Sequence, residues 1–227
     1  HEIESMAGSI SGLSGRNSSG LSMTGLSRFF EESFEIFADS LFGATIPEEE
    51  FEREQMMLLQ KIRGRRDKLS AVNFDQFAEA FFSPHPYGRP KVGTEQTVRS
   101  LTPEDVRAFH RDVVTPEDLV LTVVGDVDPQ NAVRLAERHL HRTETDASET
   151  PEIPKPPERS EPSMVVGDLE KKQAHVAVGF DAPLLGTDEQ YALRVLYAIL
   201  SGQGGRLFYE LRDRKSLAYS VHAKSLM

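Results

Sequence analysis

The sequence contains no cysteine among its 227 residues. Without thiolates, the chain can form neither a disulfide framework nor a cysteine-ligated metal site. It also lacks long apolar runs, and its hydrophobic stretches fall far short of the roughly 20 residues that a membrane-spanning helix requires. Basic residues are outnumbered, with 26 Lys and Arg against 36 Asp and Glu, and the net charge of −10 repels a phosphate backbone. We therefore expect neither a membrane segment nor a general nucleic-acid binder.

The composition of the chain is that of a globular protein that can bury a hydrophobic core. Hydrophobic residues make up 38% of the sequence, and apolar positions recur at helical or strand spacing over long segments. The clearest break is at residues 142–162, where this periodicity stops and five of the 13 prolines fall between 151 and 162. We predict a linker there, between a first domain at residues 1–141 and the start of a second at 163–227, both truncated.

Start and stop signals predict helices on both sides of this break. The phenylalanine-rich segment that begins at Phe29 stops at Gly43, which is typical of a helix with a glycine C-cap. Capping patterns at Thr45–Glu48 and Thr102–Asp105 predict two more helix starts, the first helix running to about Arg66. Further helices are expected at residues 74–82, 132–140, 187–200 and 206–211.

Strands are predicted where β-branched residues and leucines run together. These runs are residues 119–124, 163–166, 175–180 and 217–221, and the Gly- and Ser-rich segment 8–27 is predicted to form short strands and turns. Because helices and strands follow one another without strict βαβ alternation, the fold class is α+β. We expect two related α/β layer domains, in each of which helices pack on a mostly antiparallel sheet.

Most residues that could carry chemistry have an ordinary structural explanation. The seven histidines lack ligand spacing, so structural or surface roles are predicted for them. Gly202–Gly205 could hold an anion before a helix, but it lacks the phosphate-loop pattern and is predicted to be a turn. The basic cluster at 61–68 ends a helix that begins with glutamates at 48–54, an order that suits the helix dipole without any ligand.

Arg212 and Tyr219 leave two interpretations open. A guanidinium at a helix end and a phenol on the segment after it are both suited to holding a peptide carbonyl or a developing oxyanion. From chemistry alone, a salt-bridged arginine and a packed tyrosine are the more ordinary explanation.

Several short stretches, in order along nearly the whole chain, resemble the insulinase, pitrilysin and mitochondrial-processing-peptidase family of zinc peptidases. They are Ile3–Gly8, His85–Gly88 with Gly93–Thr94, Leu101–Asp105, Val123–Asp126, Gly205–Phe208 and Leu211–Val221. Any one of them is weak, but together they are specific. The resemblance implies a repeated α/β domain, paired within each half of a clam-like molecule that encloses unfolded peptides.

Active halves of this family bind zinc through an inverted H-x-x-E-H motif and the second Glu of a later E-x-x-x-x-x-x-E helix. The resemblance places the histidine motif upstream of residue 1. In the later helix Glu54 matches the first Glu, but Lys61 stands in place of the second. Because an ammonium cannot ligate Zn²⁺ and repels it, we expect no metal site here and zinc in the partner half.

In such non-zinc halves the family carries an arginine and tyrosine pair, spaced as Arg212 and Tyr219 are. The resemblance implies that Arg212 holds a substrate backbone carbonyl and that Tyr219 helps to stabilise the tetrahedral oxyanion, with zinc-bound water and its glutamate base coming from the facing half. We therefore expect the non-zinc half of a bacterial-type zinc metalloendopeptidase, inactive by itself. Its partners would be the zinc-bearing half, on the same chain or a separate subunit, and an unfolded peptide.

The alternative function is a non-catalytic structural or scaffolding member of the same fold, like the core subunits of respiratory complexes. Retention of Arg212 and Tyr219 favours the peptidase.

We predict that added protease cuts first within residues 142–162, because proline-rich polar backbone has little to pack against. Limited digestion, with mass spectrometry of the fragments, checks this. First cuts within 47–66 or 187–211 would show that the domain boundary is misplaced.

Overall fold

The computed structural model describes residues 2–116, 119–140, 154–155, 157 and 161–225. The chain divides into two compact units, residues 1–177 and 178–227, and each is described by itself. The predicted linker at 142–162 lies largely outside the described residues, so the domain boundaries stay a prediction.

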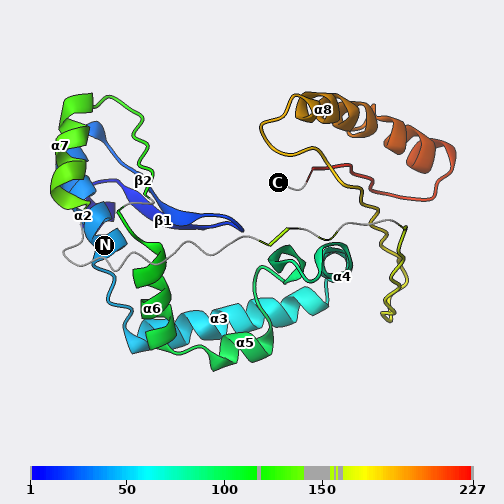
Figure 1. Cartoon of the computed structure of the whole chain (residues 1–227), viewed down its shortest axis with the longest axis horizontal. Coiled ribbons are helices and arrows are strands. Elements are labelled where there is room, and N and C mark those ends of the chain that lie inside the picture. The colour runs from blue at the N-terminus through cyan, green and yellow to red at the C-terminus, as the bar shows by residue number, and fades with distance from the viewer. Residues whose placement is uncertain (1, 117–118, 141–153, 156, 158–160, 226–227) are drawn as a thin grey trace. The chain divides into compact units, whose positions relative to one another are not determined.

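Helices dominate both units (Figure 1). The first unit contains α1 (Glu2–Ser5), β1 (Ser9–Ser14), β2 (Ser19–Thr24), η1 (Ser27–Phe29), α2 (Phe30–Phe42), α3 (Glu48–Arg66), α4 (Leu69–Phe82), η2 (Pro86–Gly88), α5 (Glu95–Ser100), α6 (Pro103–Val113) and α7 (Pro129–His139). The second contains α8 (Glu189–Leu200) and the π-helix η3 (Phe208–Arg214). Among the described residues, none of the helices combines the length and apolarity that crossing a bilayer requires.

The helices agree with the sequence patterns more closely than the strands do. α2 ends at Phe42 with Gly43 as its C-cap, as predicted, and α4 begins at Leu69 rather than at Phe74. The short strands expected within 8–27 are confirmed as the antiparallel pair of β1 and β2, in which Ser9 lies opposite Thr24.

The other predicted strands are wrong. In the part of the chain that the structure describes, the sheet consists of β1 and β2, and the runs 119–124, 163–166, 175–180 and 217–221 are not strands. Val120 and Val124 are 89% and 92% exposed rather than buried. β-branched runs become strands only where a neighbouring strand supplies a ladder and a packed face. The expected layers of helices on a large antiparallel sheet are corrected to a helix-rich chain with a small antiparallel sheet.

The hairpin is held by the motif His85–Gly88. Between the strands, the Arg16 guanidinium donates to the Tyr87 carbonyl at 2.8 Å and lies over the Tyr87 ring, 5.3 Å from its centroid. The Tyr87 hydroxyl also donates to the Asn17 side chain. His85 is 7% exposed, and its Nδ1 accepts the Tyr87 N–H, which fixes the turn. The motif is thus a structural anchor for the hairpin.

α2 and α7 pack together to form the most buried part of the first unit. Phe34 and Ala38 of α2 are 2% and 4% exposed, and Leu135 of α7 is 5% exposed. Full burial of a phenylalanine or leucine contributes about 1.5–3 kcal/mol. The apolar stripe read from the sequence at Phe34, Phe37 and Leu41 therefore positions this pair of helices.

The basic end of α3 joins three helices. Arg63 and Arg66 each contact the Glu95 carboxylate of α5 at 3.1 Å, and Arg65 contacts Asp75 of α4 at 2.7 Å. The Arg63 hydrogen bond, with the nearby charge of Arg66, holds the pKa of Glu95 below its usual value. The basic cluster thus has a structural role, but through ion pairs with neighbouring helices that the helix-dipole explanation did not include.

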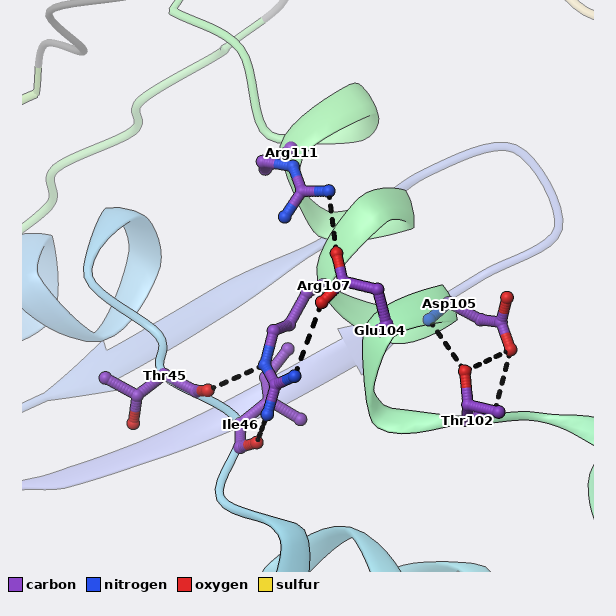
Figure 2. Close-up of polar contacts among 7 residues, drawn as sticks. All are labelled: Thr45, Ile46, Thr102, Glu104, Asp105, Arg107 and Arg111. Carbon is purple, nitrogen blue, oxygen red and sulfur yellow. Dashed lines mark hydrogen bonds and ion pairs between the residues drawn. The ribbon is translucent and has the colours of Figure 1, made fainter.

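α6 begins where the sequence predicts. The Thr102 hydroxyl accepts the Asp105 N–H at 3.2 Å, and the Asp105 carboxylate accepts the Thr102 N–H at 2.8 Å, so both halves of the capping box form (Figure 2). The hydrogen bond from the Thr102 side chain, with that from its backbone, lowers the pKa of Asp105.

Arg107, one turn into α6, holds the connection between α2 and α3. Its Nε donates to the Thr45 carbonyl at 3.2 Å and a terminal nitrogen donates to the Ile46 carbonyl at 2.9 Å (Figure 2). Ile46 has φ +48°, a left-handed backbone that is unfavourable for a β-branched residue. The capping pattern predicted at Thr45–Glu48 is not used, because the N-cap is Pro47 and Thr45 lies too far before it.

We expect Arg107→Ala to lower the free energy of unfolding by about 1–2 kcal/mol, because two carbonyls lose a charged donor and the left-handed Ile46 loses its support. Denaturant unfolding of the purified chain measures this. The matched control is Arg53→Ala, which removes a surface guanidinium whose ion pairs among the described residues are with Glu50 and Glu54 of the same helix, and should cost less than about 0.5 kcal/mol. Equal losses in the two variants would contradict the assigned role.

Candidate functional site

The candidate site lies in the second unit, where a glycine-rich turn follows α8. Gly202 has φ +82°, as the turn predicted from the sequence allows. Gly205 is buried, and a Cβ there would lie 2.2 Å from the Ser201 carbonyl oxygen. Only glycine fits this close approach of two backbone segments, so the direction in which the chain leaves α8 depends on Gly205.

The chain then forms a helix that is wider than an α-helix. Helical backbone begins at Arg206 and becomes the π-helix η3 over Phe208–Arg214, which shifts the helix predicted at 206–211 toward the C-terminus. π-helical turns are rare and occur frequently at functional sites. Within η3 the Arg214 guanidinium binds both oxygens of Glu210, at 2.8 and 3.1 Å.

A tight reversal after η3 brings the next segment back along the helix. Ser216 has φ +48°, and the Leu211 carbonyl accepts the N–H groups of Leu217 and Ala218, at 2.8 and 3.3 Å. These bonds replace the strand predicted at 217–221, because the backbone donors at its start bond to η3 instead of to a neighbouring strand. The reversal places Tyr219 beside the last turn of the helix.

Arg212 and Tyr219 are brought together by this reversal. The Arg212 Cζ lies 4.8 Å from the centroid of the Tyr219 ring and 4.7 Å from that of the Phe208 ring. We call Phe208, Arg212 and Tyr219 the Arg212 cluster. Arg212 is half-buried, whereas Tyr219 is 84% exposed.

The cluster presents hydrogen-bond donors without matching acceptors. In the part of the chain that the structure describes, Arg212 pairs with no carboxylate, in contrast to Arg214. A guanidinium held over aromatic rings keeps its N–H groups for acceptors such as a backbone carbonyl. The nearby phenol adds one more donor, so the cluster is suited to holding a peptide carbonyl or an anionic oxygen.

Phe208 is a member of the cluster that sequence reasoning missed. Its signal was present, because positions four apart share a face of a helix and Phe208 precedes Arg212 by four. The sequence could not show that the helix would widen into a π-helix, nor that the reversal at Ser216 would bring Tyr219 to the same guanidinium.

α3 does not fit a metal ion. Glu54 and Lys61 are both exposed on it, and Glu54 lies 3.6 Å from the Arg53 guanidinium. Among the described residues, no three His, Asp or Glu side chains come together as a metal-binding group. An ammonium at Lys61 supplies no lone pair to a cation, so no reaction step can be assigned to a metal on this helix.

The described histidines have structural partners. His85 is buried at the hairpin anchor, His110 bonds the Leu41 carbonyl at 2.8 Å, and His175 bonds the Asn73 side chain at 3.2 Å. His139 packs its ring against Phe34, with centroids 6.4 Å apart, and His222 bonds the Ser220 hydroxyl at 2.8 Å. These contacts agree with the structural or surface roles predicted for them.

A protein-family profile described as the peptidase M16 inactive domain matches residues 100–226, which include the whole Arg212 cluster. The chain belongs to this family. Membership in the M16 family confirms the resemblance to insulinase-like zinc peptidases.

Among curated M16 relatives, an uncharacterized zinc protease of Mycobacterium leprae is 30% identical over 200 residues, which cover 85% of this chain and 44% of the relative. A similarly named protein of Streptomyces coelicolor is 32% identical over 200 residues, covering 84% and 43%. The chain therefore spans less than half the length of these relatives.

Two solved structures share the M16 fold. A protease from Helicobacter pylori matches with a TM-score of 0.76 and 22% identity, over 99% of this chain and 55% of that one. A peptidase M16 inactive domain from Pseudomonas fluorescens matches with a TM-score of 0.77 and 17% identity, over 97% and 54%.

We expect Gly205→Ala to disrupt the Arg212 cluster of this M16 chain, because the added methyl group has no room beside the Ser201 carbonyl. Overlaps of this size cost about 1–3 kcal/mol or more. Thermal unfolding measures the loss. Gly204→Ala is the matched control, since a Cβ at Gly204 meets nothing within 4 Å. A Gly205→Ala variant as stable as Gly204→Ala would contradict the close approach.

Proposed function

We propose that this chain acts as the non-zinc half of an M16 zinc peptidase and completes an active site and peptide chamber for unfolded peptides. The zinc-bearing half would lie on the same chain or on a partner subunit. The related two-domain organisation inferred from the resemblance is part of this proposal. Family membership and the zinc-protease names of the relatives support it.

The observation that carries the proposal is the Arg212 cluster. Arg212 is held over two rings beside an exposed phenol and, among the described residues, has no carboxylate partner, so its N–H groups are left for a ligand, which favours the peptidase over a scaffold. Burial and pairing are the ordinary uses of arginine and tyrosine in a fold, and Arg214 shows that pairing in the same helix. The unpaired donors of Arg212 are explained by a ligand that brings its own acceptors.

In this role Arg212 donates hydrogen bonds to a backbone carbonyl of the peptide and fixes its position. Tyr219 donates its hydroxyl hydrogen bond to the oxygen that becomes negative when the scissile carbonyl is attacked. When bound in the facing half, zinc would supply the activated water for that attack. This chain contributes orientation and charge stabilisation, which is why a half without metal ligands remains useful.

We expect Tyr219→Phe in the natural full-length protein to lower kcat about 10²- to 10³-fold with little change in KM, because one donor to the developing oxyanion is lost while the ring remains. Hydrolysis of an unfolded fluorogenic peptide measures both constants. Tyr209→Phe is the matched control, since Tyr209 is 56% exposed in the same helix and outside the cluster. It should leave both constants unchanged.

Arg212→Ala should raise KM and lower kcat, because the peptide is both held and oriented by the guanidinium. Arg214→Ala removes the neighbouring guanidinium, which is engaged with Glu210, and should have little effect. Near-normal kinetics in both Tyr219→Phe and Arg212→Ala would favour the scaffolding function instead.

A further inference from the structure

We propose that Phe208 is a positioning residue for Arg212, holding the guanidinium over its ring so that its donors face the peptide. This inference rests on the proposed function, because it assigns to Phe208 the task of presenting Arg212 to substrate. It adds a third side chain to the arginine and tyrosine pair and makes the π-helix part of the site.

The contact itself has the geometry of a cation–π interaction. The Arg212 Cζ is 4.7 Å from the Phe208 ring centroid, within the roughly 6 Å at which such attraction is significant. Phe208 and Arg212 are both half-buried, whereas Tyr219, on the other contact, is 84% exposed. Because desolvation strengthens a cation–π interaction, the Phe208 contact is the more constraining of the two.

An aromatic ring can hold an arginine without consuming its donors. The Arg214 guanidinium, two residues further on, is fixed by Glu210 and donates its hydrogen bonds to that carboxylate, at 2.8 and 3.1 Å. The Phe208 ring contacts the guanidinium through its π-system, so the N–H groups at the rim remain available. A free arginine side chain loses about 2 kcal/mol of rotamer entropy when it is fixed, and Phe208 fixes it before the peptide binds.

The spacing of four residues on a helix explains why the two side chains meet. Phe208 is the first residue of η3, and Arg212 follows one turn later on the same side. The Leu211 carbonyl, next to Arg212, accepts the two N–H groups that start the reversal to Tyr219. Phe208 and Tyr219 are therefore fixed to one short segment, and Arg212 has a ring contact from each.

The test is a double-mutant cycle in the natural full-length protein. Phe208→Leu keeps an apolar side chain of similar size but removes the ring, and should lower kcat/KM for an unfolded fluorogenic peptide about 3- to 30-fold, mainly by raising KM. Phe208→Tyr restores a ring face and should return kcat/KM to within about twofold of wild type. Combining Phe208→Leu with Arg212→Ala should cost no more than Arg212→Ala alone, because Phe208 acts through Arg212.

Tyr209→Leu is the matched control, since it removes a neighbouring ring that does not contact Arg212, and should leave kcat/KM unchanged. Circular dichroism and the melting temperature establish that each variant folds. If Phe208→Leu does not fold, Phe208→Met replaces it as a flexible apolar substitute without a ring.

The outcomes separate this inference from the proposed function. Suppose that Arg212→Ala is impaired. If Phe208→Leu is then normal, or if the losses in the double variant are additive, the positioning role is overturned and the proposed function stands. Additivity would mean that Phe208 contacts the peptide or supports the fold independently. A normal Arg212→Ala overturns the positioning role, and together with a normal Tyr219→Phe it overturns the proposed function as well.

Discussion

The arrangement of the second unit depends on one backbone carbonyl, that of Leu211. By accepting the N–H groups of Leu217 and Ala218 it ends the π-helix and turns the chain back, with Ser216 in a left-handed conformation at the corner. The position of Tyr219 relative to Arg212 follows from this reversal. The arrangement of side chains at the candidate site thus depends on main-chain hydrogen bonds. Such bonds do not require particular side chains, so the sequence alone does not predict the arrangement.

Local signals predicted local structure well. Gly43 after α2 and the capping box of Thr102 and Asp105 at the start of α6 each act within one or two helical turns, and both are found as expected. The run at 119–124 failed because a strand is defined by a partner elsewhere in the chain, and β-branched residues carry no information about that partner. The capping pattern at Thr45 failed because α3 begins after Pro47, and the backbone at Thr45 is held instead by Arg107, sixty-two residues later.

The residues of the candidate site likewise include some that the sequence identified and one that it did not. Spacing and resemblance pointed to Arg212 and Tyr219, and the resemblance also placed Lys61 where the zinc halves of the family have a glutamate ligand. Phe208 escaped notice because a phenylalanine near a helix start ordinarily reads as core. Its spacing of four residues from Arg212 was visible in the sequence, but the widening of the helix into η3 and the reversal that brings Tyr219 to the same guanidinium were not.

The segment that carries the cluster is closed at its base. The Ser201 hydroxyl donates to the Ala223 carbonyl at 2.9 Å and accepts the Ala223 N–H at 3.2 Å, so the two ends of residues 202–222 are joined. Loop-closure entropy grows only slowly with length, so a segment tied in this way tolerates insertions in its outer turns at small cost. Most of the entropy cost of closing the segment falls at the Ser201–Ala223 contact, which joins its two ends directly after α8.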